Sequence, residues 1–358
     1  METMELTAKF YQGKRVFLTG STGFKGSWLC RMLLLMGAEV TGYALEPPTR
    51  PALFELLGLS QQIQQMTADI RNLEALQKAM QECKPEIVFH LSAQPLVSEG
   101  YLNPVDTYST NVMGTVNLLE SIRHCDSVQS VVNVTTDKVY QNLEWCYPYR
   151  ETDTLGGSDP YSSSKSCSEL VTNAYIQSFL REQGKAVSTC RAGNVIGGGD
   201  FSLNRIIPDC FRAVQAKKTI FLRNPHSVRP YQHVLEPLSA YLLVAMQQYQ
   251  NADLAGSYNI APEQSGCITT EELTALFGEY WGNGFTYERN PHSPAFHEAG
   301  LLKLDSSLIR QKMGFRDCWN IRETVRHTVE WYQEYLSGGD IVALTDKQLI
   351  QYGENENV

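Results

Sequence analysis

Two pairs of neighbouring residues in this chain are suited to acid-base chemistry. Tyr161 and Lys165 are four residues apart in a segment with helical spacing, so their side chains share one face of a helix. A nearby ammonium favours the phenolate form of tyrosine, which makes Tyr161 a candidate base for removing a hydroxyl proton during hydride transfer. Asp137 and Lys138 follow a short β-prone run and place a carboxyl beside an ammonium. Because Tyr-x-x-x-Lys also occurs by chance in many helices, its meaning depends on the rest of the chain.

A glycine-rich turn near the N-terminus has the spacing of a dinucleotide-binding site. Gly20, Gly23 and Gly26 are three residues apart, directly after a predicted strand and at the start of a predicted helix. The first permits a tight turn, the second lets the backbone approach a pyrophosphate, and the third lets the helix pack close to the strand. The phosphate charge then meets the helix N-terminus. We expect Thr22 and Phe24 to contact the dinucleotide. The alternative is an ordinary glycine-rich β-to-α connection.

The second predicted strand lacks the acidic residue that usually binds the adenosine ribose of NAD. It ends at Gly42-Tyr43-Ala44-Leu45 with Glu46 just beyond, so this rule leaves the choice between NAD and NADP open. Asp69 and Ile70, after the third predicted strand, are candidate adenine contacts. Spacing alone equally allows Asp69 to cap the following helix.

Alternating strand and helix patterns predict an α/β protein with a doubly wound parallel sheet. The expected strands lie at 15–19, 39–43, 64–67, 87–91, 131–135 and 186–190, with a further one at 257–260. The expected helices lie at 27–36, 73–82, 105–124, 161–183 and 235–248. We therefore predict a Rossmann domain over residues 1–190, with returns near 230–262, and a smaller, mainly substrate-binding domain over 191–358. Only the tails are expected to stay outside the folded parts.

The composition limits the class of partner. Lys and Arg number 30 against 39 Asp and Glu, and the net charge of −9 argues against a nucleic-acid partner. The nine cysteines include no C-x-x-C pair, which is typical of reduced thiols in packing positions and gives no reason to expect a metal site. Apolar runs such as 32–38 and 240–246 are far shorter than the roughly 20 residues of a membrane span. The N-terminus lacks the features of a signal peptide, so we expect a cytoplasmic protein without a membrane partner.

Together, the glycine turn and the Tyr-x-x-x-Lys pair resemble the extended short-chain dehydrogenase/reductase family, and the resemblance covers nearly the whole chain. Further segments agree with that family: His90-Leu91-Ser92-Ala93-Gln94, Asn111 with Gly114-Thr115, and Arg191-Ala192-Gly193-Asn194-Val195. The resemblance implies that the substrate is contacted by Gln94 and the nicotinamide cofactor by Leu91, Ala93, Asn111, Tyr161 and Lys165. Each segment alone has a structural explanation, since a histidine can simply end a strand and an asparagine can bond to helix backbone. Their order and spacing favour the family.

The segment after the fifth predicted strand narrows the resemblance. Val134-Thr135-Thr136-Asp137-Lys138-Val139-Tyr140 is similar to the active-site strand of the sugar-nucleotide 4,6-dehydratases, at the edge where open α/β sheets place ligands. In the deoxythymidine-diphosphate-glucose branch this strand carries Thr-Asp-Glu, with Asp as acid and Glu as base. Here Lys138 replaces the Glu, and together with segments 24–29 and 229–237 it resembles the cytidine-diphosphate-glucose branch. The alternative is an Asp-Lys surface pair in an epimerase or reductase.

This resemblance implies an NAD-dependent lyase that converts cytidine-diphosphate-glucose to its 4-keto-6-deoxy derivative and water. Tyr161 would take the proton of the sugar 4-hydroxyl, with Thr136 hydrogen-bonded to the same oxygen. Asp137 would protonate the departing 6-hydroxyl, which requires that its carboxyl hold a proton. Lys138 has two possible roles: it removes the C5 proton, for which the ammonium must first lose its own, or it stabilises the developing enolate.

The diphosphate and sugar also need cationic and polar partners in the second half of the chain. The candidates are Asn194, Arg205 and Arg229, because arginine offers a planar donor fork that suits phosphate. An arginine at these positions could equally form a surface ion pair.

Two other functions fit parts of the pattern. A nucleotide-sugar 4-epimerase makes the same 4-keto intermediate, but it expels no 6-hydroxyl and has no need for Asp137 and Lys138. A cofactor-sensing protein on the same fold has no need to retain Tyr161 and Lys165. Family members commonly associate through helices beside the active site, which implies a homodimer or homotetramer.

Overall fold

The computed structural model describes residues 3–263, 266–289 and 300–355. Its largest element is a seven-stranded parallel sheet with the strand order β10-β6-β5-β4-β1-β2-β3. The strands are β1 (Arg15–Thr19), β2 (Glu39–Ala44), β3 (Gln64–Thr67), β4 (Ile87–His90), β5 (Ser130–Val134), β6 (Ala186–Ala192) and β10 (Ser257–Ile260). The predicted doubly wound sheet is confirmed. The strand order reverses between β1 and β4, which is where sheets of this kind bind ligands.

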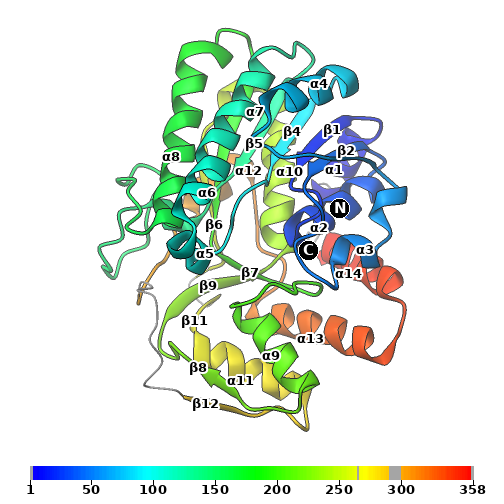
Figure 1. The fold of residues 1–358 in the computed structure, drawn as a ribbon, viewed down its shortest axis with the longest axis vertical. Coiled ribbons are helices and arrows are strands. Elements are labelled where there is room, and N and C mark those ends of the chain that lie inside the picture. Colours follow the sequence, from blue (N-terminus) through cyan, green and yellow to red (C-terminus); the bar gives the residue numbers. More distant parts are fainter. Residues whose placement is uncertain (1–2, 264–265, 290–299, 356–358) are drawn as a thin grey trace.

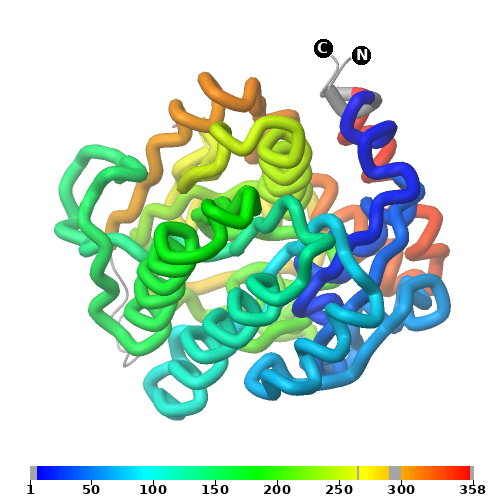
Figure 2. The backbone as a smooth tube through the Cα atoms, turned by 90° about the horizontal axis from the view of Figure 1, so that it is seen from above, coloured from blue at the N-terminus to red at the C-terminus, as the bar shows by residue number. Residues whose placement is uncertain are grey.

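Helices cover both faces of this sheet, and Figure 2 shows the two layers with the strands between them. Alternate residues of a strand face opposite sides, so Phe17 packs under one layer while Val16 and Leu18 pack under the other. The first layer contains α4 (Leu73–Cys83), α7 (Gly114–Arg123) and α8 (Pro160–Tyr175), and the second contains α2 (Phe24–Leu35) and α10 (Leu235–Gln250). The near-continuous apolar strands therefore match burial on both faces.

The two longest predicted helices of the first layer contain π-helical turns. The predicted helix at 105–124 consists of α6 (Pro104–Tyr108), the π turn η2 (Ser109–Met113) and α7. The predicted helix at 161–183 consists of α8 and the π turn η4 (Ile176–Leu180). A π turn adds one residue to a helical turn and is often found beside functional sites. The 3.6-residue period used for prediction does not distinguish it from regular α-helix.

A second group of elements lies below the main sheet in Figure 1. A three-stranded sheet contains β7 (Asn194–Ile196), β9 (Val228–His233) and β11 (Cys267–Thr269), and a two-stranded sheet contains β8 (Ile220–Leu222) and β12 (Tyr287–Arg289). Around them lie α9 (Ile206–Gln215), α11 (Thr270–Trp281) and α13 (Ile321–Ser337). Between β9 and β11 the chain returns to the main sheet with α10 and β10. Shorter helices complete the chain: α3 (Leu53–Leu56), η1 (Leu59–Gln61), α5 (Val97–Leu102), η3 (Asp137–Val139), η5 (Ala252–Leu254) and α12 (Ser307–Met313).

Both ends of the described chain are helical, so the expectation that the tails stay outside the fold is wrong. Helix α1 (Thr3–Tyr11) packs on α10, where the Tyr11 hydroxyl donates to the Leu242 carbonyl over 2.9 Å. Helix α14 (Ile341–Asn355) is fastened by the Tyr352 hydroxyl, which donates to the buried Glu236 carboxylate over 2.8 Å. Their apolar residues complete the core around α10, a tertiary role that tail position alone does not reveal. Among the described residues, no helix is long and apolar enough to cross a membrane.

Candidate active site

Nearly all of the candidate residues line one cavity of about 1290 Å³. It follows the carboxyl ends of β1, β4, β5 and β6, where parallel strands present their loops, and continues to α9 and β8. All predicted site residues line it except Asn111: Gly20, Thr22, Gly23, Phe24, Gly26, Asp69, Ile70, Leu91, Ala93, Gln94, Thr136, Asp137, Lys138, Tyr161, Lys165, Asn194, Arg205 and Arg229. The cavity is larger than the roughly 300–1,000 Å³ of a typical small-ligand pocket, which suits two large ligands side by side.

The glycine turn is shaped by close backbone approaches that a side chain would block. Gly20 has φ +76°, and a Cβ built there lies 2.8 Å from the main-chain carbon of Leu91. A Cβ built on Gly26 lies only 2.0 Å from the carbonyl oxygen of Gly20. Gly23 is the N-cap of α2 and leaves the first turn of that helix without a side-chain cap. This arrangement fits the pyrophosphate of a dinucleotide, because free backbone N–H groups at a helix N-terminus bind phosphate.

The structure decides whether Asp69 caps the following helix. Helix α4 is capped by Asn72, whose side chain accepts from the backbone of Ala75, so Asp69 is not the cap. The Asp69 carboxylate instead forms an ion pair with Arg71 at 2.6 Å, which holds the pKa of that carboxyl below its usual value. Glu46 also lines the cavity, two residues beyond the end of β2. It is therefore an acidic side chain near the position where the sequence rule found none.

The catalytic candidates form a connected group at the ends of β5 and α8. Asp159 caps α8, and Pro160 is the first residue of this helix. Tyr161 therefore lies in its first turn. The Thr136 hydroxyl donates to Oδ1 of Asp137 over 2.9 Å. It also lies close enough to the Tyr161 oxygen to lower the pKa of that phenol. Thr136 therefore lies next to both the candidate base and the candidate acid.

Asp137 is enclosed, and its two oxygens differ. Its side chain is 1% exposed, and Oδ1 lies 3.5 Å from the ammonium of Lys138, which is 25% exposed. Oδ2 is buried and has no hydrogen-bond partner within the part of the chain that the structure describes. A buried oxygen without a partner is costly unless it carries a proton or meets a ligand. The Oδ2 atom of Asp137 is therefore a candidate contact for a bound ligand.

Burial dominates the electrostatics of this group. It raises the pKa of Tyr161 to about 12, with Thr136 opposing this shift, so the net shift is upward rather than the downward shift expected from a neighbouring lysine. Burial also lowers the pKa of Lys165 to about 8, and its ammonium donates to the Val134 carbonyl over 3.2 Å. Lys25 was overlooked at the sequence level, although it lies inside the glycine turn. Burial and the charges of Arg205 and Lys165 lower its pKa to about 7.

The far end of the cavity contains the predicted arginines. Arg205 pairs with the buried Asp200 at 2.9 Å, and Arg229 donates to the Val228 carbonyl over 2.9 Å. Asn194, the first residue of β7, also lines the cavity. Both arginines have partners within the protein and still line the cavity.

The side chains of two predicted contact residues, Gln94 and Asn111, form hydrogen bonds within the protein. The Gln94 amide donates to the Leu96 carbonyl and the Thr107 hydroxyl. Asn111 is buried within η2, where it accepts from the Gln94 backbone and donates to the Gln94 carbonyl and the Ser164 hydroxyl. Asn111 thus fastens the loop after β4 to α8, and it reaches the cavity only through that loop.

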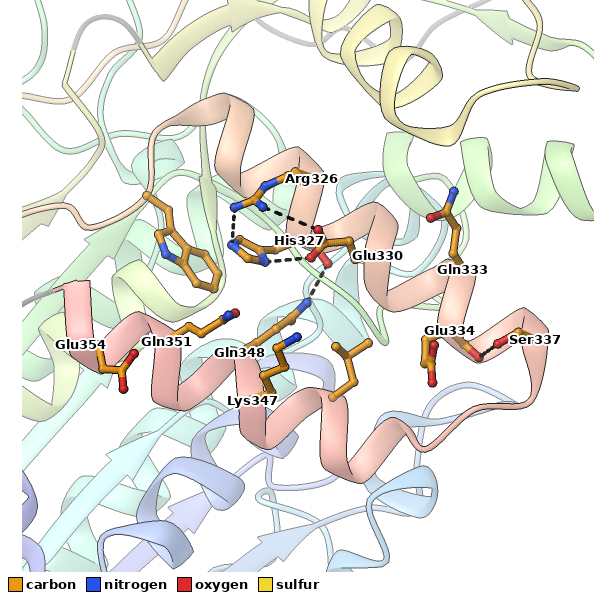
Figure 3. Close-up of a pocket in the computed structure, with 12 residues that line it drawn as sticks. Arg326, His327, Glu330, Gln333, Glu334, Ser337, Lys347, Gln348, Gln351 and Glu354 are labelled. Carbon is orange, nitrogen blue, oxygen red and sulfur yellow. Dashed lines mark hydrogen bonds and ion pairs between the residues drawn. The ribbon is translucent and has the colours of Figure 1, made fainter.

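A second hollow lies between α13 and α14 and has different chemistry (Figure 3). Its histidine, His327, is engaged at both ring nitrogens, by Arg326 at 3.2 Å and by Glu330 at 3.1 Å. Because arginine only donates, the Nε2 atom of His327 accepts and its Nδ1 atom donates, which is the neutral tautomer. Among the described residues, no group of three or more His, Cys, Asp or Glu is placed to hold a metal ion. The catalytic candidates lie in the larger cavity.

A glycine turn at the first βα junction of a Rossmann sheet, with Tyr161 and Lys165 on the helix beside it, defines a short-chain dehydrogenase/reductase. The model of the GDP-mannose 4,6 dehydratase family matches residues 17–328. The chain belongs to that family.

Known relatives and solved structures are similar over almost the whole chain. The CDP-glucose 4,6-dehydratase of Salmonella typhimurium is 44% identical over 96% of this chain and 97% of its own length. The structure of a UDP-glucose 4-epimerase from Thermus thermophilus in complex with NAD has a TM-score of 0.77 at 25% identity, covering 89% of this chain and 99% of the other. The structure of a dTDP-glucose 4,6-dehydratase from Bacillus anthracis in complex with NAD has a TM-score of 0.76 at 20% identity, covering 92% and 100%.

The close packing at Gly26 yields a direct test of the dinucleotide cradle. In Gly26→Ala the added Cβ meets the Gly20 carbonyl and must displace the start of α2. We expect the affinity for NAD, measured by titration calorimetry, to fall at least about tenfold, or about 1.4 kcal/mol. Gly256→Ala is the control, because a Cβ there meets nothing closer than 3.9 Å. A folded Gly26→Ala protein with unchanged NAD affinity would contradict the placement of the cofactor.

Proposed function

We propose that this protein is a lyase that converts CDP-glucose to CDP-4-keto-6-deoxyglucose and water, using bound NAD. The observation that carries the proposal is the enclosed Asp137, with one unpartnered oxygen, in the same cavity as Tyr161. Loss of the 6-hydroxyl needs an acid, whereas simple oxidation or epimerisation at C4 does not. The 44% identity to the Salmonella typhimurium enzyme supports the nucleotide assignment.

The first half of the cavity fits the cofactor. We assign the pyrophosphate to the turn from Gly20 to Gly26, the adenine to Ile70, and the adenosine ribose to Glu46. These residues would hold NAD with its nicotinamide in the cavity, where it would supply reversible hydride transfer with the sugar. A carboxylate facing the ribose disfavours the 2′-phosphate of NADP by charge repulsion, which favours NAD.

Tyr161 is the base at the 4-hydroxyl in this proposal. Since burial raises its pKa to about 12, it needs cations nearby in order to give up its own proton, and Arg205 is one that lowers this pKa. The Lys165 ammonium, held by the Val134 carbonyl, is another cation beside the reacting end of the cavity. We assign Thr136, which lies beside the phenol, to a hydrogen bond with the same sugar oxygen.

Asp137 and Lys138 together can supply the acid and the base of water loss. The two groups lie 3.5 Å apart, and for the elimination Asp137 would have to act as a carboxylic acid and Lys138 as a neutral amine. The acid protonates the departing 6-hydroxyl, and the amine removes the C5 proton made acidic by the neighbouring ketone. We therefore assign the base role to Lys138 and the acid role to Asp137.

The second half of the cavity fits the nucleotide sugar. Arg205 and Arg229 are assigned to the diphosphate, with Asn194 beside them. Because Asp200 already balances Arg205, that arginine is held in place before the substrate arrives. Gln94 is assigned to the wall of the sugar subsite through the loop that its side chain braces.

The 4-epimerase alternative shares the fold and the Tyr161 chemistry, and epimerases are among the similar structures. Asp137 and Lys138 remain unexplained by it. A cofactor-sensing role leaves the whole group from Thr136 to Lys165 unexplained.

We also propose that copies of the chain pair through the helices beside the site, forming a homodimer or homotetramer. Large apolar side chains are exposed along α5, α6 and α8, including Leu102, Val105 and Leu170. Sedimentation equilibrium would detect the assembly, and a strictly monomeric protein would contradict it. We place the reaction in the cytoplasm, which keeps thiols reduced; all nine cysteines are free.

Turnover of CDP-glucose tests the function as a whole. Purified protein with NAD should convert CDP-glucose to a 4-keto-6-deoxy product, seen by NMR as a new C6 methyl group without net NADH. UDP-glucose and dTDP-glucose serve as matched substrates that differ only in the nucleoside. Formation of a C4 epimer without a methyl group would establish the epimerase, and no turnover would leave only a binding function.

The role of Lys138 can be separated from the oxidation at C4. In Lys138→Met the amine is lost, and we expect deuterium incorporation at C5 from D2O to fall roughly 10²–10⁴-fold while cofactor reduction by substrate persists. Lys78→Met, at a side chain 78% exposed, is the control. Normal deuterium incorporation in Lys138→Met would assign the C5 proton to another group.

A further inference from the structure

Helix α8 carries a third ionisable residue on the face that bears Tyr161 and Lys165. Glu169 follows Lys165 by four residues, which repeats the spacing between Tyr161 and Lys165. Its carboxylate forms a two-point ion pair with Arg191, with Nε and Nη2 each 2.9 Å from an oxygen. The two side chains are only 2% and 4% exposed, so the pair is enclosed within the protein.

This carboxylate also joins the elements that bear the catalytic residues. It accepts hydrogen bonds from the hydroxyls of Thr135, directly after β5, and Thr189, on β6. Thr135 is the residue immediately before Thr136 and Asp137. The Nη1 atom of Arg191 donates to the Tyr140 hydroxyl over 2.8 Å. Tyr140 follows the turn that contains Asp137 and Lys138. The pair thus ties α8 to both ends of the catalytic segment.

A buried ion pair of this kind is not explained by stability alone. The desolvation cost of two buried charges commonly equals or exceeds their attraction, and well-packed apolar residues often serve as well. Here the hydrogen bonds of the carboxylate are directed at the active-site strand rather than at surface elements. Placement beside the reacting groups is what distinguishes this pair from an ordinary packing contact.

We propose that Glu169 is a positioning residue for the reaction, which holds the Thr136-Asp137 segment through Thr135 and places a carboxylate one helical turn from Lys165 on α8. The proposal rests on the proposed function for the reaction it serves. Arg191 acts in turn on Glu169, by fixing both carboxylate oxygens.

The charges around Lys165 agree with this role. Burial lowers the pKa of Lys165 to about 8, and the Glu169 carboxylate is the charge that opposes this shift. The charge of Lys165 helps to lower the pKa of Lys25, from α2, and burial lowers the pKa of His90, from β4, to about 3, so that its ring is uncharged at neutral pH. Other ionisable groups on the adjoining elements include Tyr161 of the same helix, Asp137 and Lys138 of η3, Cys190 and Arg191 of β6, and Arg205 before α9.

The test replaces Glu169 by Gln, which keeps the shape and an oxygen acceptor but removes the charge. Activity that needs the Lys165 ammonium is lost as pH rises through the Lys165 pKa, so lowering that pKa moves the loss to lower pH. We expect the basic limb of kcat in Glu169→Gln to shift down by roughly one unit, with KM for CDP-glucose nearly unchanged. Glu169→Asp, which restores the charge, should return the limb to its wild-type position.

A direct titration keeps this test independent of turnover. The Cε signal of Lys165 in 13C-lysine-labelled protein, assigned with Lys165→Met, should titrate at lower pH in Glu169→Gln than in wild type. If Glu169→Gln fails to fold, Glu169→Leu combined with Arg191→Met removes both charges, and its Lys165 signal should also titrate at lower pH. A folded variant without carboxylate whose Lys165 titrates as in wild type would overturn the proposal. Wild-type protein without dehydratase activity would instead overturn the proposed function.

Discussion

Parallel strands end at one edge of their sheet, and this constraint determines where the chemistry of the protein can lie. The glycine turn after β1, the loop after β4, Asp137 after β5 and Gly193 after β6 come from distant parts of the sequence. They meet in one cavity because β1, β4, β5 and β6 are neighbours and point the same way. The smaller group of elements closes the same edge with Arg205 and Arg229. One sheet thus brings together the glycine turn, the proton-transfer groups and the cationic side chains.

The cavity at this edge of the sheet also keeps the reacting groups away from water. Burial raises the pKa of Tyr161 to about 12 and lowers the pKa of Lys165 to about 8 and of Lys25 to about 7. In each case the neutral form is favoured, so nearby charges decide which form is present. Glu169 favours the charged form of Lys165, while Arg205 and Lys165 disfavour the charged form of Lys25. The site therefore responds to the charges of residues that do not touch the substrate.

Much of the fold and of the candidate site could be predicted because both follow short-range rules. Strand and helix periods predicted the parallel sheet, and glycine spacing predicted a turn whose backbone approaches allow no side chain. What could not be predicted depends on three-dimensional neighbours. The partner of Asp69 is Arg71 rather than a helix end, and Asn111 bonds the Gln94 backbone inside a π turn. The pKa of Tyr161 is set by burial, which the sequence does not display. Glu169 was missed because its role appears only when β5, β6 and α8 are assembled, although its spacing from Lys165 was a visible signal.

The central claim is that a single cavity oxidises C4, eliminates water and reduces C6 of the same sugar. The most direct measurement follows deuterium placed at C4 of CDP-glucose, mixed with an equal amount of uniformly 13C-labelled substrate, during turnover in ordinary water. The account predicts that deuterium appears in the C6 methyl group and stays with the molecules free of 13C. Deuterium that remains at C4, exchanges into solvent or crosses to the 13C-labelled product would contradict it.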